Sequence, residues 1–283
     1  MPHSKRAYRI ILLSIIGVYV ALMAVFTFFD YQITDSLFQL GTGFGRVFEA
    51  IGPMFMPWFM IYATIGLIMQ LKFQRRVSRV FAYIGLGFSY LYATFMGFMT
   101  HQHSYAPWMF IPSIVLYVLF TVFVIFLNQR FKKASEETRK NHIAILFVMF
   151  IVAVTSLMGV DVIKCVFGRV RYINLTDPSD FKYWFYINKF DFNSSFPSGH
   201  AARAMTTVCF SLIPLYFGKK KLAIAVEVLG IVFAVTVSIS RMVEGMHYPT
   251  DIVTGLVMTY LAFFISGHHF LAKKDEPDGQ ASL

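Results

Sequence analysis

Long stretches of apolar residues recur along the whole chain and limit the folds that it can adopt. A helix of roughly 20 apolar residues crosses a bilayer core of about 30 Å. Eight stretches approach this length, near residues 10–29, 53–71, 80–100, 108–127, 143–163, 199–217, 222–240 and 251–267. The chain is 57% hydrophobic and only 14% charged, outside the range of soluble globular domains. We therefore predict an all-α polytopic membrane bundle with about eight transmembrane helices.

The segments between these stretches are short. Phe28-Phe29-Asp30 follows the first stretch where a signal peptide would have small residues, so we expect this helix to be retained. Residues 30–52 are expected to form a short helix or loop outside the membrane. The aromatic-rich residues 172–196 are expected to lie on the outer surface, at the membrane interface.

The net charge of +10 comes mainly from basic residues gathered in five places. These are Lys5, Arg6 and Arg9; Lys72, Arg75, Arg76 and Arg79; Arg130, Lys132, Lys133, Arg139 and Lys140; Lys219, Lys220 and Lys221; Lys273 and Lys274. Because they alternate with the apolar stretches, the positive-inside rule places them and both termini in the cytoplasm. The basicity is a topology signal, and we expect no nucleic-acid partner. The compact loops and the lack of an organellar address favour a bacterial inner or plasma membrane.

Three clusters of polar residues interrupt the apolar pattern. The first polar cluster is Lys164 and Arg171, the second is Pro197-Ser198-Gly199-His200, and the third is Ser240, Arg241, His247 and Asp251. The predicted topology brings all three to the external face. Loop charge and cluster position are independent readings, and one miscounted helix would have split the clusters across the bilayer.

The second and third clusters have the geometry of an anion-binding and nucleophilic site. Ser198 is placed to cap the helix that follows, and Gly199 lets an anion approach its free N–H groups. His247 precedes a helix that Pro249 would begin, and Asp251 lies one turn inside it. A carboxylate bonded to one imidazole nitrogen would fix the tautomer and leave the other nitrogen free to attack or to take a proton.

The cations complete this chemistry. Lys164, Arg171 and Arg241 suit a phosphoryl group, and such a set can stabilise phosphoryl transfer without a metal. We predict no metal site and no cofactor. Each piece also has a structural interpretation, because a single Arg at a helix end usually extends to the interface. Arg203 and Asp161 could contact a lipid head group or the residues that hold the phosphate, or they could form an ion pair at the helix ends. Glu244 is expected to be a solvated loop carboxylate.

The three clusters together resemble the three-part signature of the type 2 phosphatidic acid phosphatase superfamily. The resemblance covers about residues 160–255 by motif and the last six spans by architecture. It implies a six-helix phosphatase core at residues 80–270. Residues 1–79 would then be two additional transmembrane helices with an external loop, and residues 271–283 a cytoplasmic tail.

The resemblance also implies a role for each matching residue. His247 would be the nucleophile that forms a phosphohistidine, Asp251 would orient it, and His200 would protonate the leaving oxygen. The residues that would hold the phosphate are Lys164, Arg171, Ser198, Gly199 and Arg241. The first part of the signature usually ends in Arg-Pro, whereas Tyr172 follows Arg171 here. We therefore expect a changed loop path.

The expected activity is hydrolysis of a lipid phosphate or pyrophosphate monoester at the outer membrane face. Transfer to another acceptor, or hydrolysis of a soluble phosphate ester, would use the same residues. An anion or lipid transporter is the alternative from another class, although transporters usually place their site near the midplane. Candidate substrates are phosphatidic acid, phosphatidylglycerophosphate, undecaprenyl pyrophosphate and a lipid A phosphate. The sequence does not indicate an oligomeric state.

Overall fold

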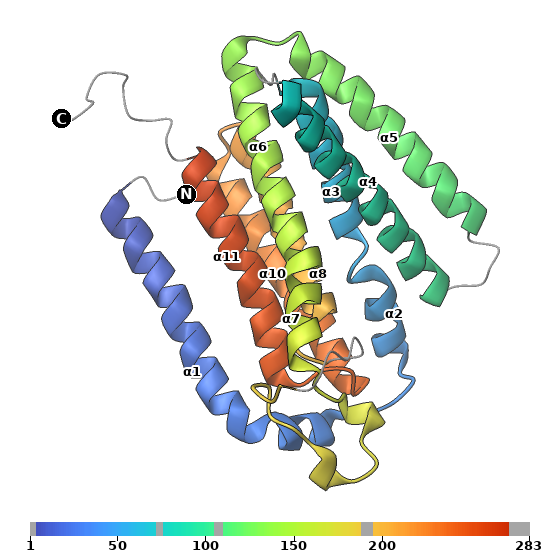
Figure 1. Ribbon diagram of the computed structural model, residues 1–283. Coiled ribbons are helices and arrows are strands. Elements are labelled where there is room, and N and C mark those ends of the chain that lie inside the picture. Colours follow the sequence, from blue (N-terminus) through green and yellow to red (C-terminus); the bar gives the residue numbers. More distant parts are fainter. Residues whose placement is uncertain (1–3, 72–75, 105–109, 188–194, 272–283) are drawn as a thin grey trace.

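The computed structural model describes residues 4–71, 76–104, 110–187 and 195–271, with the side chains of 96–104 and 110–113 excepted. Every regular element in these ranges is helical, which confirms the predicted all-α class. The main helices (Figure 1) are α1 (Lys5–Leu37), α2 (Gly43–Ile51), α3 (Phe55–Gln70), α4 (Arg76–Ser104), α5 (Phe110–Lys132), α6 (Glu136–Val154), α7 (Val160–Phe167), α8 (Gly199–Met205), α9 (Leu212–Tyr216), α10 (Lys220–Val243) and α11 (Pro249–Leu271).

Six segments in the described ranges are long and apolar enough to cross a membrane. They are Lys5–Leu37, Gly43–Gln70, Ile114–Lys132, Glu136–Asn174, Lys220–Val243 and Pro249–Leu271. The other two predicted spans correspond to α4 and to a run in which the 3-10 helix η5 (Thr206–Ser211) separates α8 from α9. The protein is thus a helical membrane bundle.

Local sequence signals set the ends of these helices. Ser4 and Ser135 cap α1 and α6 by accepting hydrogen bonds from backbone N–H groups. Gly168, with φ of 39°, ends α7 in the left-handed conformation that glycine adopts most easily. One boundary differs from expectation. Because α1 continues to Leu37, Asp30 lies inside this helix and not beyond its end.

The core lies between α3, α6, α10 and α11. Phe59 of α3, Val152 of α6, Val237 of α10 and Phe263 of α11 belong to one buried apolar cluster. In Figure 1, α1 lies along α11 at one side of the bundle and α5 lies at the other side. The division at residue 79 stays a prediction, although helices on both sides of it pack together.

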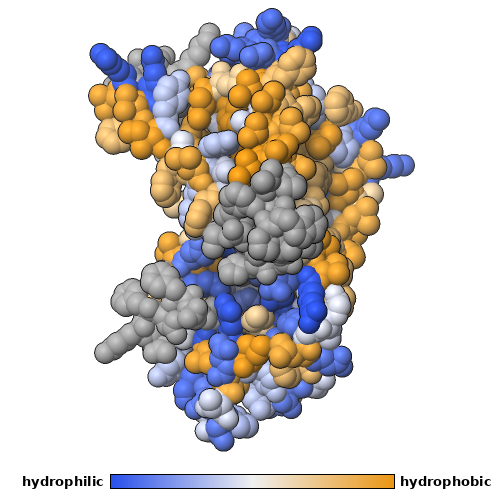
Figure 2. Space-filling model, turned by 90° about the vertical axis from the view of Figure 1, so that its right-hand side faces the viewer, coloured by the Kyte–Doolittle hydropathy of each residue, from blue (hydrophilic) through white to orange (hydrophobic). Residues whose placement is uncertain are grey.

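The outer surface fits contact with lipid. Peripheral helices expose large apolar side chains, and Phe28 of α1 is 72% exposed. Figure 2 shows hydrophobic residues over much of one face, while hydrophilic residues gather at the top and in the lower part. This distribution is what a bilayer requires of a bundle that crosses it.

The elements that carry the three polar clusters meet at one end of the bundle. The π-helical turn η2 (Thr155–Gly159) joins α6 to α7 in one rod, which delivers Lys164 to this end. The ends of α1, α7 and α10 and the start of α11 lie there too, at the bottom of Figure 1. The 3-10 turns η3 (Tyr172–Asn174) and η4 (Pro178–Asp180) form the loop below them. Residues 188–194 of the predicted interfacial segment, and the predicted tail from residue 272, lie outside the described ranges.

Candidate active site

His247 lies in the short connection between α10 and α11. Gly245, with φ of 66°, makes the turn that brings the chain back into the bundle. His247 is only 3% exposed, and Asp251 in the first turn of α11 is fully buried. The predicted placement of His247 before the helix and of Asp251 one turn inside it is confirmed.

The hydrogen bond that orients His247 differs from the expected one. Its Nδ1 lies 2.8 Å from the backbone oxygen of Ser195, whereas the nearest Asp251 oxygen is 3.8 Å away. A carbonyl oxygen can only accept, so Nδ1 carries the proton and the lone pair lies on Nε2. Asp251 thus faces the His247 ring at 3.8 Å, and the shorter contact of Nδ1 is with the Ser195 oxygen.

Asp251 Oδ2 has two closer donors than the His247 ring. It accepts from the Ser195 hydroxyl at 2.5 Å and from the Tyr248 backbone N–H at 2.8 Å. Asp251 therefore holds the Ser195 segment, and the Ser195 carbonyl in turn holds His247. The orientation of His247 therefore depends on two hydrogen bonds, one from Ser195 to Asp251 and one from His247 to Ser195.

The surroundings of His247 keep its ring neutral. Burial lowers the pKa of His247 from 6.5 to about 4, although Asp251 opposes this shift. A neutral imidazole with its lone pair on Nε2 is the form that can attack phosphorus.

The start of α8 forms the opposite wall of the site. Ser198 is the N-cap, as predicted, and its hydroxyl accepts from the Ala201 N–H at 3.3 Å. The Ser198 N–H donates to the backbone oxygen of Asp251 at 2.9 Å. A Cβ atom on Gly255 would stand 2.4 Å from the Ser198 oxygen. The backbones of α8 and α11 thus touch where the second and third clusters meet.

Arg241 brings a guanidinium group into this buried region. The residue is 2% exposed, and its Nη2 lies 3.2 Å from Glu49 of α2. Its Nε and Nη1 are buried and have no hydrogen-bond partner within the described structure. Buried donors of this kind normally have a partner. An anion bound between the clusters would supply one.

The first polar cluster faces the same region. Arg171 Nη1 lies 3.8 Å from the sulfur of Met246, the residue before His247. The Ile173 N–H donates to the Gly245 oxygen at 3.0 Å, which ties this loop to the turn that carries His247. The structure thus brings all three clusters together.

Tyr172 stands where the resemblance expects proline, and its side chain contacts α1. Its hydroxyl donates to Asp35 of α1 at 2.5 Å. Its ring packs against that of Phe38, with the centroids 5.0 Å apart. The loop that carries Arg171 is therefore attached to α1.

Arg203 and Asp161 form an ion pair of 3.7 Å at the edge of the site. Asp161 also accepts from the Tyr92 hydroxyl at 2.9 Å. Arg203 Nη1 lies 3.5 Å from the position that a Cβ atom on Gly199 would take, so its guanidinium borders the α8 start. The expected ion pair is present, and contact of Arg203 with a lipid head group stays a prediction.

Glu244 does not have the solvated environment that was expected. Only 7% of it is exposed. Its carboxylate accepts from the backbone N–H groups of Gly41 and Thr42, both at 3.1 Å, and from the Thr42 hydroxyl at 3.0 Å. It fixes the start of α2 to the third cluster.

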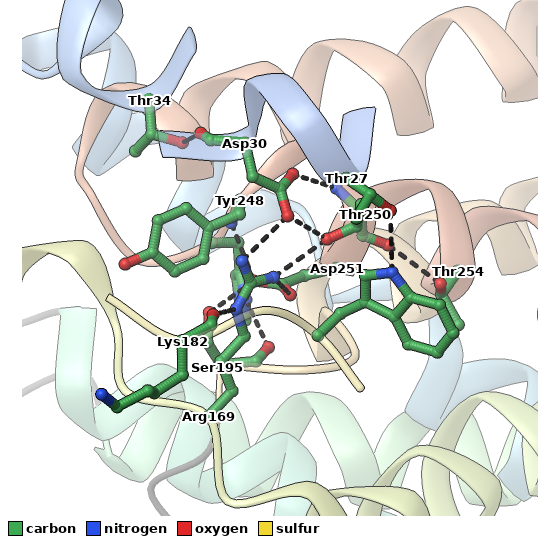
Figure 3. Close-up of polar contacts among 12 residues, drawn as sticks. Thr27, Asp30, Thr34, Arg169, Lys182, Ser195, Tyr248, Thr250, Asp251 and Thr254 are labelled. Atoms are coloured by element: carbon green, nitrogen blue, oxygen red, sulfur yellow. Dashed lines mark hydrogen bonds and ion pairs between the residues drawn. The ribbon is translucent and has the colours of Figure 1, made fainter. Parts of the chain in front are cut away.

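Arg169 is a buried residue that the sequence analysis did not assign to the site. It is 1% exposed and forms ion pairs with Asp251 and with Asp30 of α1, as Figure 3 shows. The available signal was its position, directly after Gly168 and two residues before Arg171 of the first cluster. No group of three or more metal-ligating side chains occurs in the described ranges.

Residues 141–274 match the family model described as the PAP2 superfamily. This part of the chain belongs to the PAP2 superfamily. The matched PAP2 region contains all three polar clusters, so the resemblance inferred from them is confirmed. The chain is also 27% identical over 175 residues to the undecaprenyl-diphosphatase of Sulfolobus acidocaldarius, an alignment that covers 62% of this chain and 70% of that relative. No solved structure matches the chain. The PAP2 match and this relative support a membrane-embedded lipid phosphatase.

Proposed function

We propose that this PAP2 protein hydrolyses a lipid diphosphate or lipid phosphate through a phosphohistidine at His247, without a metal ion. The observation that carries the proposal is the environment of His247. Its Nδ1 is held by a carbonyl oxygen, so Nε2 has the lone pair. The unpartnered donors of Arg241 belong to the same polar cluster. A nucleophile and an anion-binding group are thus combined in one buried region.

The reaction would proceed in two steps. The His247 Nε2 lone pair forms a bond to phosphorus while the bond to the leaving oxygen breaks, and His200 gives its proton to that oxygen. Water then attacks phosphorus and gives a proton to His200, and the N–P bond breaks. Lys164, Arg171 and Arg241 would balance the negative charge of the phosphoryl oxygens throughout.

A lipid diphosphate is the substrate that we favour among the candidates. The relative is named an undecaprenyl-diphosphatase, and Arg203 adds a fourth cation to the three of the clusters. Turnover of undecaprenyl pyrophosphate, phosphatidic acid, phosphatidylglycerophosphate and a lipid A phosphate by purified protein would rank these substrates. A clear preference for a monophosphate would contradict this part of the proposal.

Rapid quenching of the purified protein with ³²P-labelled lipid diphosphate tests the mechanism. We expect an acid-labile, base-stable phosphoprotein in the wild type and none in His247→Gln. Turnover should persist in excess chelator. A fully active His247→Gln variant would refute the nucleophile, and loss of turnover with chelator alone would refute the metal-free reaction.

Product analysis separates the alternatives. Release of inorganic phosphate excludes a pure phosphotransferase. Uptake of a labelled anion into proteoliposomes without hydrolysis would favour a transporter.

A further inference from the structure

Asp30 is a buried carboxylate on a helix that exposes most of its side chains. Its neighbours Phe28 and Phe29 are 72% and 52% exposed, whereas Asp30 is fully buried. Placing a carboxylate in a membrane-spanning helix is costly, and such residues are rarely present without a function. The contacts of Asp30 therefore indicate what it does.

Among the described residues, the hydrogen bonds and the ion pair of the Asp30 carboxylate lead to the start of α11 and to Arg169. The Thr250 backbone N–H donates to Oδ1 at 2.9 Å, and the Thr250 hydroxyl donates to Oδ2 at 2.5 Å. Arg169 Nη2 lies 2.8 Å from the same Oδ2. Thr250 directly precedes Asp251, so α1 contacts the chain beside the third cluster.

Arg169 joins Asp30 to Asp251 (Figure 3). Its Nη1 donates to Asp251 Oδ1 at 2.7 Å and to the Thr250 hydroxyl at 2.9 Å. Its Nε donates to the Lys182 backbone oxygen at 2.9 Å. The Tyr248 ring lies 4.0 Å from the guanidinium carbon. With its donors distributed in this way, the guanidinium has one fixed position between the carboxylates.

The charges in this cluster do not cancel. Two carboxylates share one guanidinium, and all three side chains have no exposed surface. If Arg169 faced Asp251 alone, it would neutralise that carboxylate. Because Asp30 shares the guanidinium, one net negative charge remains near His247, whose Nδ1 is 3.8 Å from Asp251 Oδ2.

We propose that Asp30 and Arg169 are positioning residues. Together they hold Asp251 and leave one negative charge that stabilises the positive His247 ring in the phosphoenzyme. This inference rests on the phosphohistidine of the proposed function. It assigns a role in the reaction to α1, which lies outside the matched PAP2 region.

Separate rate constants for formation and hydrolysis of the phosphoenzyme test the inference. Formation places positive charge on the ring, and hydrolysis removes it. We expect Asp30→Asn to slow formation about 10- to 100-fold, the range found for hydrogen-bond partners that orient metal ligands, with KM within about twofold. Hydrolysis should be as fast as in the wild type or faster, so the ratio of the two rate constants falls.

Three variants separate charge from packing. Asp30→Glu keeps the charge and should retain the wild-type ratio. Asp180→Asn makes the same chemical change at an exposed loop carboxylate and should leave both rate constants unchanged. Arg169→Lys keeps the net charge but cannot contact both carboxylates as the guanidinium does. Formation and hydrolysis of the phosphoenzyme should therefore slow by the same factor. This variant also tests the inference if Asp30→Asn does not fold.

The two proposals fail in different ways. A wild type that forms no phosphoprotein refutes the proposed function. A wild type that forms it, with an Asp30→Asn variant that has both wild-type rate constants, overturns the roles of Asp30 and Arg169. Equal slowing of both steps in Asp30→Asn overturns the charge effect and indicates a structural role.

Discussion

At the scale of single residues, the structure changes how His247 and Asp251 are connected. The two residues are spaced so that a direct contact was expected, but Ser195 lies between them in the hydrogen-bond chain. The sequence could not reveal this, because the acceptor is a backbone oxygen and any residue at position 195 would carry one. Side-chain identity predicts which groups are charged, and backbone geometry decides which of them meet.

The ionisation of His247 can be measured by ¹⁵N NMR of histidine-labelled protein, with His247→Gln identifying its signals. Burial lowers its pKa to about 4, so we expect the ring to stay neutral, with Nδ1 protonated, from pH 8 down to about pH 5. The folded state then binds fewer protons than the unfolded state between pH 6.5 and pH 4. The contribution of His247 to the free energy of unfolding should therefore decrease as the pH falls through that range. A midpoint near 6.5 would contradict the described environment.

Arg241 offers a test of anion binding. Replacing Arg241 by Ala removes charged hydrogen bonds worth about 1.5–3 kcal/mol, so the inhibition constant of vanadate should rise about 10- to 100-fold. The inhibition constant of Arg241→Lys should lie between those of the wild type and Arg241→Ala, because an ammonium group keeps the charge but cannot form the paired hydrogen bonds of a guanidinium. Arg46→Ala, at an exposed position of α2, is the control. Unchanged vanadate inhibition in Arg241→Ala would show that the anion binds elsewhere.

At the scale of elements, the order and approximate position of the helices could be predicted from apolar stretches and caps. Ser198 and Pro249 begin helices where their chemistry indicates. The extension of α1 to Leu37 could not be predicted, because Asp30 reads as the end of an apolar span. Its partner Arg169 comes from a distant part of the chain. Pairing of this kind depends on tertiary packing and not on local pattern.

Gly255 provides a test of the contact between α8 and α11. A methyl group there would stand 2.4 Å from the Ser198 oxygen, so Gly255→Ala must separate the two helices. A displacement of about 1 Å can reduce turnover about 100-fold, and we expect a loss of that order in kcat. Gly17→Ala in α1 should leave activity unchanged, because a Cβ atom added there would meet no atom of a neighbouring element within 4 Å. Wild-type activity in Gly255→Ala would contradict the need for this contact.

At the scale of the whole molecule, the distribution of basic residues predicts which side of the membrane each end faces. Ser179→Cys in η4 and Lys133→Cys after α5 report on opposite ends of the bundle, in a background that lacks Cys165 and Cys209. We expect a membrane-impermeant maleimide to label Ser179→Cys in intact cells and Lys133→Cys only after permeabilisation. The reverse pattern would place the site on the cytoplasmic side.

The backbone contact between Ser198 and Gly255 also determines how stiff the site is. A contact between side chains can be remade when a rotamer changes, but a contact between two main chains has no such freedom. The distance between the start of α8 and the start of α11 therefore varies only when whole helices move. In a bundle packed on several sides, such movements are collective and slow. The phosphoryl group would be transferred between two helix ends whose separation stays nearly constant.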